Sequence, residues 1–268
     1  MKRKHSSEEE IKAPAPEPHT HSHSLFDLNF ERGDFSVNGK PVKLASSNGT
    51  QNIGTASKVW DSAVVLARFL EVEEDFPEGS LRGKSILELG SGTGLVGISC
   101  AYWGASVVLT DLPEVVGTTK ANVEQNAAAI AALQGAASVE SLDWSKVVTS
   151  VATARSYDLV LGSDLVFNES AIEPLANTLV AYVRNSTKPT VFYMAHKSRS
   201  LDIDAAMVRA FKRNGLEVEE METKAPQISI FRITPAKLVE TSATVSAAAQ
   251  AVAAAASGED STIHMSLQ

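Results

Sequence analysis

Cysteine, positive charge and long apolar runs are scarce in this 268-residue sequence. The one cysteine, Cys100, cannot form an internal disulfide, which is typical of a protein from a reducing compartment. No apolar run approaches the length that spans a bilayer, and the N-terminus carries charges where a signal peptide is apolar. The 32 acidic residues outnumber the 24 basic ones, which argues against a nucleic-acid backbone as partner. We therefore expect a soluble cytoplasmic protein that binds neither membrane nor nucleic acid.

Composition divides the chain into one folded unit between two tails. Residues 1–24 are rich in Pro, Ser and charge and contain no aromatic residue, so we expect them to be disordered. Residues 236–268 are rich in Ala and Ser and are expected to form a second tail. The basic residues at positions 2–4 fit part of a nuclear signal, which makes the nucleus a second expected location. Residues 25–235 between the tails should form a single domain.

Within this domain, strand and helix patterns alternate along the chain. Strands with a helical pattern after them are predicted at Ser85–Leu89, Ser106–Thr110, Tyr157–Gly162 and Thr190–Ala195. Such alternation predicts an α/β fold with a mostly parallel sheet. Two further predicted strands, Leu216–Met221 and Gln227–Ile233, are separated by five residues, too few for a crossover helix. We therefore expect the domain to finish in an antiparallel hairpin.

Turn and cap signals place three more elements. Asn38-Gly39 lies between alternating apolar residues, which predicts a β-hairpin. Ser57 can cap a helix that runs from about Lys58 to Glu71. Pro113 suits the first position of the helix that follows the second buried strand.

Four glycines lie in the stretch ILELGSGTGLVG, from Ile86 to Gly97, and three ligands are candidates for this loop. No Gly-Lys-Ser/Thr follows, which excludes a P-loop for a nucleoside triphosphate. A dinucleotide fits the G-x-G-x-x-G pattern of Gly92–Gly97, with Asp111 at the spacing of a ribose-binding acid. Glu88 favours S-adenosylmethionine instead, because a carboxylate at the loop repels a pyrophosphate but suits the amino-acid end of a sulfonium ligand.

Five motifs together resemble those of a known family. They are, in order, KVWDSAVVLARFLE, ILELGSGTGLVG, VVLTDLPEVVGTTKANVEQN, SLDW and YDLVLGSDLVFNESAIEPL. The chain is similar, over about residues 57–235, to class I seven-strand methyltransferases that modify lysines of non-histone proteins, the methyltransferase-like 21 group. The resemblance implies a Rossmann-like seven-stranded sheet with helices on both faces, and S-adenosylmethionine as cofactor.

The resemblance also implies which residues hold the cofactor. They are Trp60 in the helix before the first core strand, Gly90, Ser91 and Gly92 beneath the cofactor, Asp111 on the ribose hydroxyls, Trp144 beside the adenine, Ser163 through its backbone, and Glu88 near the methionine end. No residue is implied to bind a metal.

The substrate end is expected at the stretch from Asp164 to Phe167, which matches the family's Asp-x-x-Tyr motif. Asp164 would position the incoming amine, and the Phe167 ring would stabilise the cationic product. Phe167 stands where the family has tyrosine, so one hydrogen bond to the amine is lost while the ring is kept. The two prolines of base-modifying methyltransferases are absent here, which argues against a nucleic-acid base as substrate.

The leading hypothesis is therefore a monomeric N-methyltransferase that acts on a lysine of a protein, such as a chaperone or a translation factor. One alternative is a small-molecule N-methyltransferase, which would use the same cofactor residues and a closed pocket for a free amine. Another is a scaffold that binds the cofactor but has lost catalysis.

Overall fold

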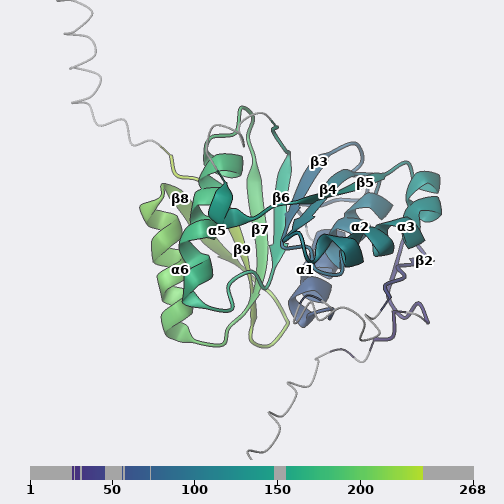
Figure 1. Cartoon of the computed structure of the whole chain (residues 1–268), viewed down its shortest axis with the longest axis horizontal. Coiled ribbons are helices and arrows are strands. Elements are labelled where there is room, and N and C mark those ends of the chain that lie inside the picture. Colours follow the sequence, from purple (N-terminus) through teal and green to yellow (C-terminus); the bar gives the residue numbers. More distant parts are fainter. Residues whose placement is uncertain are drawn as a thin grey trace, which may run out of the picture.

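The structure, a computed structural model of the chain, describes residues 26, 28–30, 32–45, 56, 58–72, 74–147 and 155–237 (Figure 1). The predicted tail 1–24, the predicted cap at Ser57 and residues 238–268 of the second predicted tail lie outside these ranges. The division into a domain and two tails therefore stays a prediction.

A seven-stranded sheet in the order β5-β4-β3-β6-β7-β9-β8 forms the centre of the domain. Its strands are β3 (Ser85–Leu89), β4 (Ser106–Asp111), β5 (Ala136–Ser141), β6 (Leu159–Ser163), β7 (Val191–Lys197), β8 (Leu216–Met221) and β9 (Ile228–Pro235). Strands β3 to β7 pair in parallel, whereas β9 is antiparallel to both β7 and β8. This confirms the predicted Rossmann-like α/β fold, including the antiparallel end.

Helices cover both faces of the sheet. On one face, α1 (Asp61–Val72), α2 (Leu95–Tyr102) and α3 (Val116–Ala132) pack in one hydrophobic cluster. On the other face, α5 (Ile172–Leu179), the π-helical turn η4 (Val180–Arg184) and α6 (Leu201–Arg213) pack in a second cluster. Figure 1 shows α5 and α6 toward one side of the strands and α2 and α3 toward the other. None of the described helices combines the length and the apolar character needed to cross a membrane.

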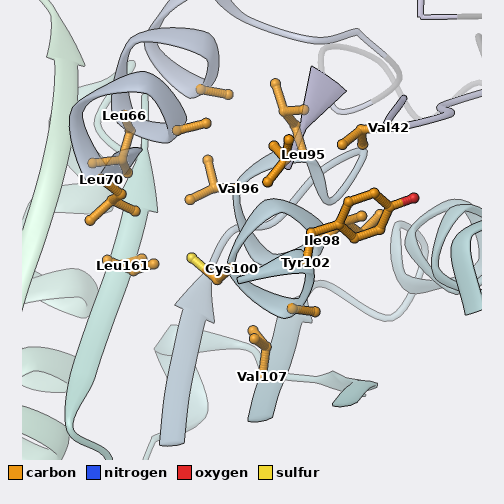
Figure 2. Close-up of a cluster of buried hydrophobic side chains, with 14 of the residues drawn as sticks. Val42, Leu66, Leu70, Leu95, Val96, Ile98, Cys100, Tyr102, Val107 and Leu161 are labelled. Atoms are coloured by element: carbon orange, nitrogen blue, oxygen red, sulfur yellow. The ribbon is translucent and has the colours of Figure 1, made fainter. Parts of the chain in front are cut away.

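The two clusters explain why the central strands are continuous apolar runs. Phe192 and Met194 of β7 belong to the cluster with α5 and α6, and the alternating Tyr193 and Ala195 belong to the cluster with α1 and α2. A strand buried on both faces needs apolar residues at every position. Figure 2 shows the α1–α2 side, where Cys100 packs as a buried side chain.

Most predicted elements differ from the observed ones by no more than two residues at either end, but one strand was missed and two helices begin three residues later than predicted. Strand β5 was missed because it is an edge strand of small and polar residues with mostly exposed side chains. Helix α3 begins at Val116, because the residues from Pro113 form a turn in which the Val115 N–H donates to the Leu112 carbonyl (2.9 Å). Helix α1 begins at Asp61, so Trp60 precedes the helix and does not lie within it.

The predicted hairpin is present before α1. Strands β1 (Ser36–Val37) and β2 (Lys40–Pro41) pair antiparallel around Asn38 and Gly39, whose φ angles are 49° and 70°. Positive φ at both turn positions is the type I′ geometry that matches the twist of paired strands. The Asn38 amide also donates to the Tyr102 carbonyl (3.0 Å), which ties the hairpin to α2.

Two buried asparagines of α3 hold the segment after the hairpin. Asn126 accepts from the Lys43 N–H (3.1 Å) and donates to the Lys43 carbonyl (2.7 Å), while its Oδ1 also accepts from the Tyr102 hydroxyl (2.7 Å). Asn122 accepts from the Ala45 N–H (3.0 Å) and donates to the Thr93 carbonyl (2.9 Å) in the glycine loop. Helix α3 therefore links the N-terminal segment to the loop that follows β3.

We predict that Asn126→Ala lowers the free energy of unfolding by about 2–3 kcal/mol, because it leaves several buried polar groups without partners. Urea unfolding followed by tryptophan fluorescence measures this change. Asn177→Ala is the matched control, since Asn177 is an exposed asparagine of α5 whose loss should change stability by no more than about 0.5 kcal/mol. Equal effects of the two substitutions would contradict the role given to Asn126.

Candidate active site

A cavity of about 580 Å³ opens at the carboxyl ends of β3, β4 and β6. Strands β3, β4 and β5 are laid out to one side of this point and β6 and β7 to the other, so it is the topological switch point of the sheet. All the predicted site residues except Glu88 line the cavity: Trp60, Gly90, Ser91, Gly92, Asp111, Trp144, Ser163, Asp164 and Phe167. Among the described residues, no group of three or more His, Cys, Asp or Glu side chains is placed to hold a metal ion.

The glycine loop forms the floor of the cavity and leaves no room for a side chain at Gly90. Its φ is 59°, and a Cβ added there would lie 2.7 Å from a methyl carbon of Leu165 and 3.4 Å from the Trp144 ring. The neighbouring Ser91 lines the cavity, and its buried hydroxyl has no hydrogen-bond partner among the described residues. A buried hydroxyl of this kind is normally satisfied, so the loop has a donor available for a polar ligand.

Asp111, at the end of β4, ties the loop to the next strand. One carboxylate oxygen accepts from the Gly92 N–H (2.7 Å), and the other accepts from the Leu112 N–H (2.8 Å). Burial raises the pKa of Asp111, and these two backbone bonds oppose that rise. Each oxygen uses one of its two acceptor positions for the backbone. The carboxylate can therefore still accept two hydroxyl groups from a ligand in the cavity.

Two tryptophans stand at the cavity wall. Trp144 begins the short helical turn η2 (Trp144–Lys146), which Asp143 caps by accepting from the Ser145 N–H (3.0 Å). The Trp60 carbonyl accepts from the Ala63 N–H (3.0 Å) in the first turn of α1. The Trp60 ring has the Lys58 Nζ 5.5 Å from its centroid and the Arg199 guanidinium carbon 5.4 Å from it. Both tryptophans thus line the cavity, and the Trp60 ring lies beside two cationic groups.

Glu88 lies behind the glycine loop and does not line the cavity, contrary to the expectation that it reaches the ligand. Its side chain is 1% exposed, and its Oε2 accepts from the Gly97 N–H (2.9 Å) in the first turn of α2. The N-cap of α2 is Gly94, which has no side chain to satisfy that amide. A Cβ at Gly97 would lie 2.5 Å from the same oxygen. Glu88 therefore caps α2, and Gly97 makes room for it.

Asp164 and Phe167 both reach the cavity, as predicted, but their surroundings differ. Phe167 is 62% exposed at the rim. The Asp164 side chain is 5% exposed, and its Oδ1 accepts from the Lys197 N–H (3.0 Å). Arg199 donates to both oxygens, at 3.1 Å and 2.9 Å. Sequence reasoning missed Arg199, although its position two residues past β7, at the ligand edge of the sheet, was a usable signal.

Burial raises the pKa of Glu88 from 4.5 to about 8, with the Gly97 N–H opposing the rise and the Asp111 charge adding to it. The folded protein then holds a proton that the unfolded chain releases above pH 4.5. The stability due to Glu88 is complete below pH 4.5 and is lost as pH rises through about 8. We predict that Glu88→Gln abolishes this pH-dependent loss of stability. In the wild type, the contribution of Glu88 to the free energy of unfolding should fall by up to about 1.4 kcal/mol per pH unit between pH 4.5 and about 8.

Urea unfolding of the ligand-free protein between pH 5 and 9 tests this prediction. The stability of Glu88→Gln relative to the wild type should increase with pH, because the glutamine keeps an acceptor for Gly97 and does not ionise. Glu124→Gln, at an exposed position of α3, should follow the wild type at every pH. Parallel stability curves for Glu88→Gln and the wild type would show that Glu88 does not titrate in this range.

Comparison with known proteins gives sequence relatives and a structural neighbour. Protein N-lysine methyltransferase METTL21A of Danio rerio is 36% identical over 156 residues, 58% of this chain and 67% of that protein. METTL21A of Mus musculus is 40% identical over 129 residues, 48% of this chain and 56% of that protein. EEF1A lysine methyltransferase 3 of Mus musculus is 34% identical over 172 residues, 63% of this chain and 67% of that protein. The matches thus span 56% to 67% of these relatives.

One structural neighbour is magnesium protoporphyrin IX methyltransferase from Synechocystis PCC 6803 with bound SAM, at 16% identity and a TM-score of 0.46. The similarity covers 65% of this chain and 78% of that chain. A model of the lysine methyltransferase family matches residues 38–213, which include the glycine loop, the end of β4, η2 and the stretch from Asp164 to Phe167. Because this match extends over more than half of the sequence, the chain belongs to the lysine methyltransferase family.

Proposed function

We propose that this protein transfers a methyl group from S-adenosylmethionine to the side-chain amine of a lysine in a non-histone protein. The observation that carries the proposal is a single cavity at the switch point, which joins the glycine loop and Asp111 to the acid–aromatic stretch of Asp164 and Phe167. Membership of the lysine methyltransferase family supports both the cofactor and the kind of acceptor.

The residues at the cavity fit the cofactor. The Ser91 hydroxyl has no hydrogen-bond partner among the described residues, and Gly90 lets Leu165 and the Trp144 ring pack directly against the backbone of the loop. In this proposal Asp111 accepts from the two ribose hydroxyls, Trp144 lies beside the adenine, and Trp60 and the Ser163 backbone complete the wall. Glu88 acts indirectly, by holding α2 behind the loop. When bound, S-adenosylmethionine supplies a methyl group on a positively charged sulfur.

At the substrate end, the chain must admit an amine, orient it and let it lose a proton. Asp164 and Phe167 lie three residues apart in the sequence, and both line the cavity. We propose that Asp164 orients the amine through a hydrogen bond and that the Phe167 ring contacts the methylated cation. Alignment of the amine with the methyl group can lower the barrier by several kcal/mol, up to about 7–11 in favourable intramolecular reactions.

The rim of the cavity favours a protein substrate over a free amine. Phe167 stays 62% exposed beside the opening, which is unlike the closed pocket that a small-molecule enzyme needs. We propose a translation factor or a chaperone as the target, and the relative named EEF1A lysine methyltransferase 3 supports the former. We also propose that the protein acts as a monomer in the cytoplasm and the nucleus, without nucleic-acid or membrane partners, in line with its net charge of -8.

Methyl-labelled S-adenosylmethionine, incubated with the full-length protein and a cell lysate, tests the proposed function. We expect a discrete labelled protein whose acid hydrolysate contains methylated lysine. Label found only in small molecules would support a small-molecule methyltransferase instead. No label above that of lysate alone would indicate a cofactor-binding scaffold. Either of these two outcomes would overturn the proposed function.

Cofactor binding is tested separately at Asp111. We predict that Asp111→Ala weakens S-adenosylmethionine binding at least about ten-fold, because charge-assisted hydrogen bonds worth about 1.5–3 kcal/mol are lost. Isothermal titration calorimetry measures the affinity, and NAD should give no measurable heat. Asp202→Ala, at an exposed position of α6, should bind like the wild type. Binding of NAD, or unchanged affinity in Asp111→Ala, would overturn the cofactor contacts.

A further inference from the structure

Arg199 forms a two-pronged ion pair with Asp164 at the cavity, and the cofactor and substrate contacts proposed above leave Arg199 without a role. It follows β7, lines the cavity and donates to both oxygens of Asp164. Its own side chain is 38% exposed, whereas that of Asp164 is 5% exposed. The guanidinium therefore lies over a nearly buried carboxylate, between that group and the solvent. A two-pronged contact of this kind fixes orientation as well as charge.

The backbone at Asp164 is held in an uncommon conformation. Its φ is 54°, in the left-handed region, and its N–H donates to the Ala195 carbonyl (2.9 Å). The Lys197 N–H adds a third donor to the carboxylate. A carboxylate has about four acceptor positions, so three donors leave one for an incoming group. Strained backbone that neighbouring bonds hold in place is often found at functional sites.

The other charged groups around this point have contacts of their own. On the α1 side, Asp61 accepts from the Lys197 ammonium (3.2 Å), and Lys58 lies over the Trp60 ring. On the α6 side, the Asp204 carboxylate contacts His196 Nε2 (2.8 Å) and the Ser198 hydroxyl. Among the described residues, Arg199 is thus the cationic side chain that hydrogen-bonds to Asp164, and it also interacts with the more distant charges of Asp204 and Asp61.

We propose that Arg199 is a positioning residue for methyl transfer. It fixes the Asp164 carboxylate with one acceptor position open. It also neutralises the charge of that carboxylate, so that the lysine amine is oriented without being held as an ammonium ion. This inference rests on the proposed lysine methyltransferase activity. It gives Asp164 a role as a hydrogen-bond acceptor for a neutral amine.

The physical reason is the charge state that the reaction needs. The lysine ammonium first releases a proton to solvent, because only the neutral amine has the lone pair that forms the new N–C bond. The S–C bond of the sulfonium breaks as this bond forms, and its electron pair stays on the sulfur of the departing thioether. An unbalanced carboxylate within about 4–6 Å of an ionisable group stabilises its cationic form by about 1–3 pH units. Without Arg199, Asp164 would therefore hold the lysine protonated to a higher pH, and the neutral fraction at any lower pH would fall.

The test measures initial rates of label transfer from methyl-labelled S-adenosylmethionine to protein in one lysate preparation, between pH 6.5 and 10 at saturating cofactor. Four proteins are compared with the wild type: Arg199→Ala, Arg199→Lys, the double variant Asp164→Asn with Arg199→Ala, and Arg213→Ala. Arg213 is the matched control, because it is an exposed arginine of α6 that pairs with Glu173 outside the cavity. Thermal melting and cofactor titration are run on the same preparations.

We expect Arg199→Ala to move the midpoint of the pH–rate profile up by about one unit or more, with cofactor affinity within a few-fold of the wild type. In the double variant, which adds Asp164→Asn to Arg199→Ala, the midpoint should return toward that of the wild type at a reduced rate, because the unbalanced charge of Asp164 is gone. Arg199→Lys should keep the midpoint but lose rate, since it retains the charge and loses the two-pronged contact. Arg213→Ala should change neither.

A uniform fall in the rate of Arg199→Ala at every pH, with no change of midpoint, would overturn the inference and leave a purely structural role. A faster rate for Arg199→Ala would also overturn it, because Arg199 would then compete with the substrate. If the wild type labels no protein, the proposed function itself fails. If the wild type labels protein but no variant moves the midpoint, only the role of Arg199 fails.

Discussion

The hydrogen bond from the Gly92 N–H to the Asp111 carboxylate is the constraint on which the site depends. It joins the loop after β3 to the end of β4, and Asn122 and Thr119 of α3 hold the loop's carbonyls at Thr93 and Gly92. The loop can follow this path because glycine accepts positive φ at low cost. Helix α3, strand β4 and the N-terminal segment at Ala45 are therefore connected through the glycine loop, which lines the cavity.

Three carboxylates near the cavity have different roles because their surroundings differ. Glu88 is fully buried against α2, so burial raises its pKa to about 8 and it serves the fold as a cap. Asp111 is bound by two backbone amides and keeps acceptor positions toward the cavity. Asp164 is balanced by Arg199. The same chemical group thus supports the fold, faces the proposed cofactor site and faces the proposed substrate site.

The order of elements could be predicted because local pattern carries it. Strands β3 and β8 were predicted with the bounds that the structure has, and the antiparallel end followed from a five-residue connection. A strand buried on both faces needs apolar residues throughout, so an apolar run in the sequence predicts its position. Strand β5 carries no such signal, because edge strands with exposed side chains need neither an apolar run nor a branched residue.

The sequence by itself determined the fold class, the glycine loop and the residue types at the cavity, because close backbone approach and buried strands restrict which amino acids fit. Only the tertiary structure decided where the charged side chains point. Glu88 and Ser91 stand three positions apart, yet the Glu88 side chain caps α2 behind the loop, whereas Ser91 lines the cavity. Asp164 and Arg199 are 35 positions apart and meet because β6 and β7 pair in parallel. Such contacts depend on strand order and register, which no local pattern specifies.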